Sequence, residues 1–169
     1  PKNPGVKFIA LDVAKGDLFE AYYGKAYNYN PEDPQWTYQI PSNVACFVYQ
    51  EEIAGFFAGY AAVKEGYTKL GFLGGMAVPA VIRYGYGFVQ GANTAAVEMK
   101  ATSNVEIKYA YGNQFYGDQD ITAKMDTWYS AGTEVVFACG GGIYTSACEA
   151  AKKVNKFVIG VDVDQSGII

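Results

Sequence analysis

Short apolar runs alternate with amphipathic stretches from residue 69 onward. The apolar runs have the length of buried strands and fall at residues 69–73, 105–111, 134–139 and 156–161. The segments between them place apolar residues at helical spacing. One strand and one helix recur about every thirty residues, which is typical of parallel sheets. The pattern predicts an α/β fold, a doubly wound parallel sheet that forms the middle layer of a three-layer αβα lobe.

The first fifty residues follow this pattern less clearly. Residues 6–12 and 43–49 are predicted strands, whereas residues 17–29 show no clear periodicity. Residues 28–36 contain two prolines and two asparagines, which predict a loop. The tyrosines around this loop suggest either an aromatic platform for a ligand or a packed surface loop. We favour the packed loop, because scattered aromatic residues are normal at protein surfaces.

A strongly apolar helix is predicted at residues 50–65, and Gly66 suits its C-terminal end. Gly55 and Gly59 lie four residues apart and therefore share one face of this helix. Small residues at that spacing allow close packing, and we expect this face to approach a sheet.

Composition excludes several classes of function. The chain has 169 residues, of which 50% are hydrophobic and 18% charged, as in a globular protein. The formal net charge of −4 argues against a nucleic-acid partner, which requires a basic surface. The longest apolar stretch, residues 54–63, is too short to span a bilayer. There is no histidine, so histidine-dependent nucleophilic pairs and histidine metal sites are excluded within this chain.

The three cysteines form no recognisable framework. Cys46, Cys139 and Cys148 are widely spaced and show no CxxC pattern, so we interpret them as small buried residues. Cys139 ends a predicted strand and is therefore a candidate nucleophile, but the chain has no histidine to activate it. Neither a P-loop nor a GxGxxG motif is present.

The loops after the predicted strands contain the candidate binding chemistry. Because carboxyl ends of parallel strands meet at one edge of the sheet, we expect these loops to form a ligand site. Phe115 offers an aromatic face, and the Asp162 carboxylate offers two acceptors that match a pair of adjacent hydroxyls. Glycines allow a close approach of the backbone. The candidate ligand-binding residues are Phe115, Asp162, Gly141, Gly142, Gly75, Met76 and Asn113.

Each of these features also has a purely structural interpretation. Residues 140–142 could form a tight turn, Phe115 could belong to the core, and Asp162 could be a solvated strand end. Their convergence on one edge favours a site for a planar ring joined to a sugar. The edge offers no evident acid–base pair, nucleophile or metal-ligand set, so we expect binding without catalysis and without a cofactor.

Several of these segments resemble one family. YQEEIAGFFAGY at residues 49–60 resembles the YxEExAxFLAGY helix of the basic membrane protein (BMP) lipoproteins, also called PnrA-like purine nucleoside receptors. Residues 112–118 are similar to the family's GSFxD loop. CGGG at residues 139–142 and GVDVDQ at residues 160–165 resemble its AGGTG and GVDxDQ loops. The motifs occur in the family's order, and the resemblance covers nearly the whole chain from Val6.

The resemblance implies an extracytoplasmic solute-binding protein of an ABC importer, with two lobes of the type 1 periplasmic-binding-protein fold that close on a purine nucleoside. It would place Phe115 against the base and Asp162 at the ribose hydroxyls. The sequence departs from the family pattern at Asn113 and Gln114, where the family usually has Gly-Ser. It departs again at Ala77, where an acidic residue is frequent.

The resemblance also implies a domain organisation. Residues 1–48 would be a remnant of the first lobe, and residues 49–169 would be most of the second, so the chain would be a fragment. The expected partners are a small-molecule nucleoside and an ABC transporter permease. A lipid anchor outside these residues would provide the only membrane attachment, and no nucleic acid is expected.

Three alternatives remain at this point. A ligand-sensing lobe of a bacterial regulator shares this two-lobe architecture. A sugar-binding protein of the same fold is a second alternative. An α/β enzyme acting on a nucleoside or a sugar would have only Asp162, Asp164 and Cys139 as candidate catalytic residues.

Overall fold

The computed structural model describes residues 3–28, 30, 32–102 and 104–167. The chain divides into two compact units, Pro1–Tyr49 and Gln50–Ile169. No helix within the described part of the chain is both long enough and apolar enough to cross a membrane.

The first unit contains two parallel strands and one helix. Strand β1 (Phe8–Leu11) pairs with β2 (Val44–Phe47), and Phe8 lies opposite Val44. The helix α1 (Lys15–Tyr23) follows β1 and was not predicted, because it buries one side chain, Phe19, rather than a repeating apolar face.

Aromatic packing holds the connection between α1 and β2. The buried Phe19 ring stacks on Trp36, with 5.8 Å between ring centroids, and Tyr27 packs edge-on against both rings. Trp36 is 6% exposed. The interpretation of residues 28–36 as a packed loop is therefore confirmed for its described residues, and Tyr29 and Pro31 lie outside them.

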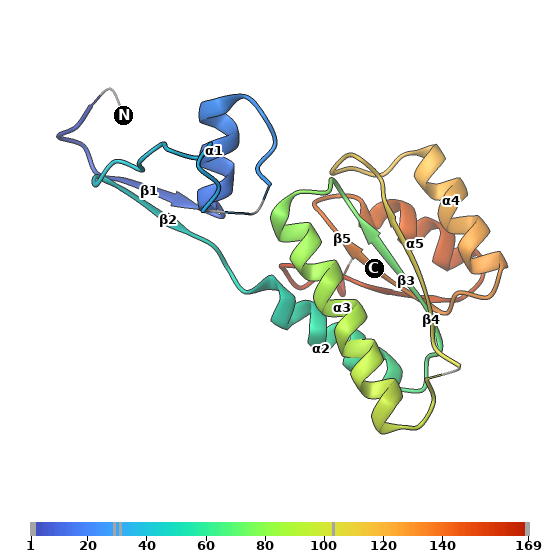
Figure 1. Ribbon diagram of the computed structural model, residues 1–169. Coiled ribbons are helices and arrows are strands. Elements are labelled where there is room, and N and C mark those ends of the chain that lie inside the picture. Colours follow the sequence, from blue (N-terminus) through green and yellow to red (C-terminus); the bar gives the residue numbers. More distant parts are fainter. Residues whose placement is uncertain (1–2, 29, 31, 103, 168–169) are drawn as a thin grey trace. The chain divides into compact units, whose positions relative to one another are not determined.

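The second unit is the predicted three-layer αβα lobe (Figure 1). Its parallel sheet has the strand order β4-β3-β5-β6. The strands are β3 (Lys69–Gly74), β4 (Glu106–Tyr111), β5 (Val135–Cys139) and β6 (Phe157–Ile159). The helices are α2 (Glu51–Lys64), α3 (Pro79–Glu98), α4 (Gln119–Ser130) and α5 (Tyr144–Lys153).

Alternate residues of the central strands face opposite helix layers. Phe72 and Phe137 pack with α2 and α3 in one apolar cluster. Leu73 and Val136 pack with α4 and α5 in the other. Both central strands are buried on both faces, which explains why they read in the sequence as continuous apolar runs rather than as alternating ones.

The glycines of α2 face another helix, and the prediction that they approach a sheet was wrong. A Cβ atom at Gly55 would overlap the carbonyl oxygen of Tyr84, and one at Gly59 would overlap that of Phe88. Gly87 and Gly91 of α3 make the reciprocal approach to the backbone of α2. The two helices therefore pack backbone to backbone, which fixes α3 on the face of the sheet and with it the residues that α3 presents to the strand ends.

Candidate functional site

The four strands of the second unit end at a common edge. Hydrogen bonds join the loops that follow the strands: Gly75 N donates to Cys139 O (2.8 Å), Gly112 N to Gly74 O (2.8 Å), and Asn113 N to Gly75 O (3.0 Å). In open α/β sheets, ligands bind at this edge. The loops named in the sequence analysis are therefore assembled where a ligand site is expected.

Phe115 rests on the glycines of two neighbouring loops. A Cβ atom at Gly75 would come within 2.6 Å of a Phe115 ring carbon, and one at Gly140 within 3.2 Å. Gly142 N donates to Phe115 O (2.7 Å), which ties the loop after β4 to the loop after β5. The Phe115 side chain is still 41% exposed. The backbone of these loops therefore supports the Phe115 ring, which still has accessible surface for stacking.

The glycines of these loops make room for the Phe115 ring as well as forming backbone hydrogen bonds. The amides of Gly75 and Gly142 donate to carbonyl oxygens of the protein, so neither amide is available to a ligand in this conformation. What Gly75 provides is space, because any side chain there would displace Phe115. Gly141 is exposed and has a φ of 54°, in the left-handed region that glycine adopts without strain.

Asp162 is held in a sharp turn after β6. Its φ is 67°, and Val163 N donates to Val161 O (2.8 Å), so the chain reverses within three residues around Asp162. The buried Gln165 side chain accepts a hydrogen bond from Val161 N (3.2 Å) and fixes the start of the turn. Non-glycine residues in this backbone region cluster at ligand-binding sites. The Asp162 side chain is exposed.

Tyr84 was not predicted to belong to the site, but its hydroxyl donates to Asp162 Oδ1 at 3.3 Å. Tyr84 lies on α3, 78 residues away in the sequence. Next to it, Arg83 Nε donates to the buried carboxylate of Glu51 at 2.6 Å, which ties α3 to the first turn of α2. Nothing in the local pattern distinguishes Tyr84 from an ordinary core-facing residue of an amphipathic helix.

The remaining predicted residues lie on the same loops. Asn113 is exposed and has a φ of 61°. Met76, in the loop after β3, is 43% exposed. The amide of Gln114 is used within its own loop, where Nε2 donates to Asp118 Oδ2 at 2.6 Å. Asn113 and Met76 are thus accessible at the edge.

Cys139 lies beneath the edge rather than on it. Its side chain is 2% exposed. Burial raises the pKa of the thiol to about 12, and the negative charges of Asp162 and Glu51 add to this effect. The thiolate is the nucleophilic form, so a raised pKa disfavours reaction. These properties contradict the interpretation of Cys139 as a nucleophile.

A thiol titration tests this conclusion. In native buffer at about pH 8, wild-type protein and Cys139→Ala should show equal numbers of reactive thiols, because the Cys139 thiol is buried and protonated. In denaturant, wild-type protein should show one more reactive thiol than the Cys139→Ala variant. An additional fast-reacting thiol in the native wild type would contradict the buried, inert cysteine.

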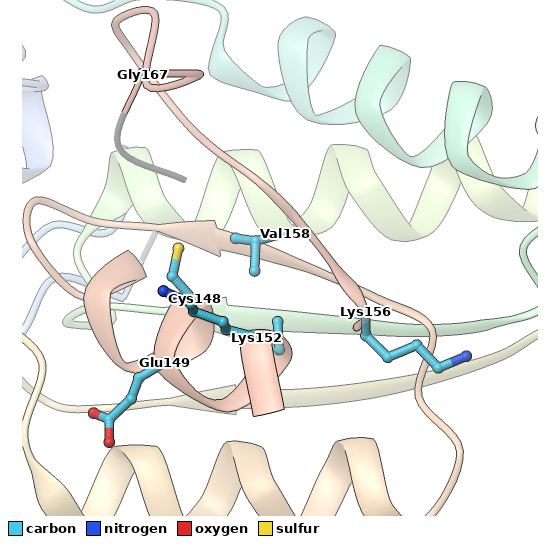
Figure 2. A pocket seen from close by; sticks show the side chains of 7 residues that line it. Cys148, Glu149, Lys152, Lys156, Val158 and Gly167 are labelled. Carbon is cyan, nitrogen blue, oxygen red and sulfur yellow. The ribbon is translucent and has the colours of Figure 1, made fainter. Parts of the chain in front are cut away.

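Two further features of the described residues concern metal binding and surface hollows. Within residues 3–28, 30, 32–102 and 104–167, no group of three cysteine, aspartate or glutamate side chains could hold a metal ion. A hollow of about 540 Å³ lies along α5 and β6 (Figure 2). It contains none of the seven predicted site residues. Its lining residues are Cys148, Glu149, Ala151, Lys152, Lys156, Val158 and Gly167.

Comparisons with known proteins agree with this fold. The family model described as ABC transporter substrate-binding protein PnrA-like matches residues 2–168. Basic membrane protein B of Borreliella burgdorferi is 36% identical over 132 residues, which are 76% of this chain and 37% of that protein. The ABC transporter nucleoside-binding protein BmpA of Lactococcus lactis is 34% identical over 134 residues, which are 73% of this chain and 36% of that protein.

A solved structure supports the fold independently. An ABC transporter solute-binding protein from Aeropyrum pernix K1 superposes with a TM-score of 0.72 at 19% identity, covering 98% of this chain and 42% of that protein. The fold is therefore that of the type 1 periplasmic-binding proteins. The chain spans less than half the length of the curated relatives described above. The match over residues 2–168 shows that the chain belongs to the PnrA-like family of ABC transporter substrate-binding proteins.

Proposed function

We propose that the protein binds a purine nucleoside outside the cytoplasm and delivers it, chemically unchanged, to an ABC transporter permease. In this proposal residues 1–48 belong to the first lobe and residues 49–169 form most of the second. A lipid anchor outside these residues holds the protein at the membrane. The nucleoside lies between the lobes, where closure removes it from water.

Two exposed groups in loops at the same sheet edge, the Phe115 ring and the Asp162 carboxylate, carry this proposal. Phe115 supplies a π-face for a planar base, and its backbone support keeps the ring in place without a ligand. Asp162 supplies acceptors for two neighbouring hydroxyls, as on a ribose. A planar base gains more from stacking on an aromatic ring than a free sugar does, so the ring and the carboxylate together favour a nucleoside. The name of the Lactococcus lactis relative also describes nucleoside binding.

Calorimetric titration of the full-length protein tests this function. We expect binding of inosine, guanosine or adenosine, and much weaker binding of free ribose. Phe115→Ala should weaken nucleoside binding by about tenfold or more, because stacking on an aromatic ring contributes about 1–3 kcal/mol per base.

Tyr116→Ala is the matched control, since Tyr116 is the next residue and its side chain is 63% exposed. This variant should bind nucleosides as the wild type does. Absence of any response to nucleosides at millimolar concentration would contradict the function. An equal loss of nucleoside affinity in Phe115→Ala and Tyr116→Ala would contradict the stacking role of Phe115.

A further inference from the structure

We propose that Tyr84 is a positioning residue, which holds the carboxylate of Asp162 in the orientation that recognises the two adjacent hydroxyls of a ribose. The inference rests on the proposed function and deepens it. It identifies a group on α3 that determines how well the loop after β6 distinguishes ribonucleosides from nucleosides that lack these hydroxyls.

The backbone of Tyr84 is fixed by the contact between α2 and α3. Gly55 lies directly against the Tyr84 carbonyl, where any larger residue would overlap it. The Tyr84 ring packs edge-on against Phe137, with centroids 6.0 Å apart and planes at 81°. Phe137 belongs to the central strand β5 and is 2% exposed. Helix packing and core packing therefore fix the direction in which the Tyr84 hydroxyl points.

The Tyr84 hydroxyl lies beside the turn that contains Asp162. It donates to Asp162 Oδ1 at 3.3 Å. The distance exceeds the commonest O–H···O separation of about 2.7–2.8 Å, so the pair has room to shorten when a ligand orders the carboxylate. An ionised carboxylate has about four acceptor positions. With one position used by Tyr84, enough remain for the two hydroxyls of a ribose.

Asp162 needs such a support because its own turn fixes only its backbone. The φ of 67° and the hydrogen bond of Val161 N to the Gln165 side chain define the course of the chain, but neither contact restrains the carboxylate. An exposed carboxylate rotates freely, and ordering it on ligand binding costs free energy. Tyr84 reduces this cost before the ligand arrives.

The Tyr84 phenol is suited to be a permanent hydrogen-bond donor to Asp162. Burial raises its pKa to about 12, and the neighbouring negative charge of Asp162 is the next largest cause and acts in the same direction. The phenol therefore keeps its proton throughout the physiological pH range, and the hydrogen bond to Asp162 is not lost as pH changes within it.

Tyr84→Phe removes the hydroxyl and leaves the ring against Phe137. In the full-length protein we expect this variant to bind a purine ribonucleoside about 5–10-fold more weakly, because the lost hydrogen bond orients Asp162 and does not itself contact the ligand. Its affinity for the matching 2′,3′-dideoxynucleoside should change by less than about twofold, because that ligand does not use the carboxylate. Calorimetry with guanosine and dideoxyguanosine gives both values.

Tyr109→Phe is the matched control. Tyr109 also packs on the face of the sheet that α3 covers, where it stacks on Phe72 and lies against Gly85, but its hydroxyl pairs with Tyr111 at 3.0 Å rather than with Asp162. This variant should bind both ligands as the wild type does. If Tyr84→Phe keeps wild-type affinity for guanosine, or weakens the binding of guanosine and dideoxyguanosine equally, the positioning role is wrong.

A measurement without ligand separates this inference from the proposed function. Tyrosine carbon NMR, with the signal of Tyr84 assigned through Tyr84→Phe, follows the ionisation of the phenol. The pKa of Tyr84 should fall in Asp162→Asn, because the variant loses the negative charge beside the phenol. An unchanged pKa would refute the contact even if nucleosides bind. If the pKa falls but the wild type binds no nucleoside, the contact stands and the proposed ligand is wrong.

Discussion

Asp162→Asn is expected to weaken binding of a purine ribonucleoside to the full-length protein by about 100-fold, because two hydrogen bonds to a charged acceptor lose strength together. Asparagine keeps the shape of the side chain and tolerates the φ of 67° at this position, so the fold should survive. Calorimetry with guanosine, and with dideoxyguanosine as the ligand that lacks the hydroxyls, measures the effect.

Asp164→Asn provides the control for Asp162→Asn within the same loop. Its carboxylate accepts a hydrogen bond from Ser166 N (2.9 Å), and it is exposed. Guanosine affinity should stay within about twofold of wild type in this variant, because its contact is local and replaceable. A loss in Asp162→Asn that is the same for dideoxyguanosine as for guanosine would show that the carboxylate does not bind the sugar hydroxyls.

Gly59→Val should lower the free energy of unfolding by about 3 kcal/mol or more, because its side chain would overlap the carbonyl oxygen of Phe88 and force α2 and α3 apart. Ala54→Val places the same side chain on an exposed position of the same helix. It should cost less than about 1 kcal/mol, the effect of helix propensity alone. Urea unfolding followed by circular dichroism compares the two. Equal destabilisation would contradict the direct contact of the two helix backbones.

The sequence predicted the second unit well because its elements carry strong periodic signals. The fully buried strand β5 (Val135–Cys139) appears as an unbroken apolar run, and the helices that flank it have clear apolar faces. The carboxyl ends of parallel strands share an edge, so the placement of the Phe115 and Asp162 loops at one sheet edge followed from topology alone. The use of these residues as a ligand site stays a prediction until it is measured.

Features that depend on tertiary packing could not be predicted. Two glycines four residues apart indicate that another element packs closely against a helix, but they do not indicate whether that element is a sheet or a second helix. Gly55 and Gly59 pack against helix α3. Tyr84 has an ordinary helical position, and its link to Asp162 exists only once the lobe is folded. Helix α1 escaped prediction because a single buried residue, Phe19, produces no periodicity.

The glycine loops illustrate a similar limit. A glycine cluster at a strand end suggests that backbone amides approach a ligand. In the structure the amide of Gly142 is paired with Phe115 O, and Gly75 makes room for the Phe115 ring. Local sequence does not reveal which backbone groups the neighbouring loop will use. The glycines therefore contribute to the site chiefly by shaping the support of Phe115.

A crystal structure of the full-length protein with a bound purine nucleoside tests the central claim most directly. We predict that the base stacks on the exposed face of Phe115, and that both ribose hydroxyls donate to Asp162 while Tyr84 still contacts its Oδ1. A nucleoside bound away from the ends of β3, β4, β5 and β6, or one whose ribose does not touch Asp162, would contradict the account.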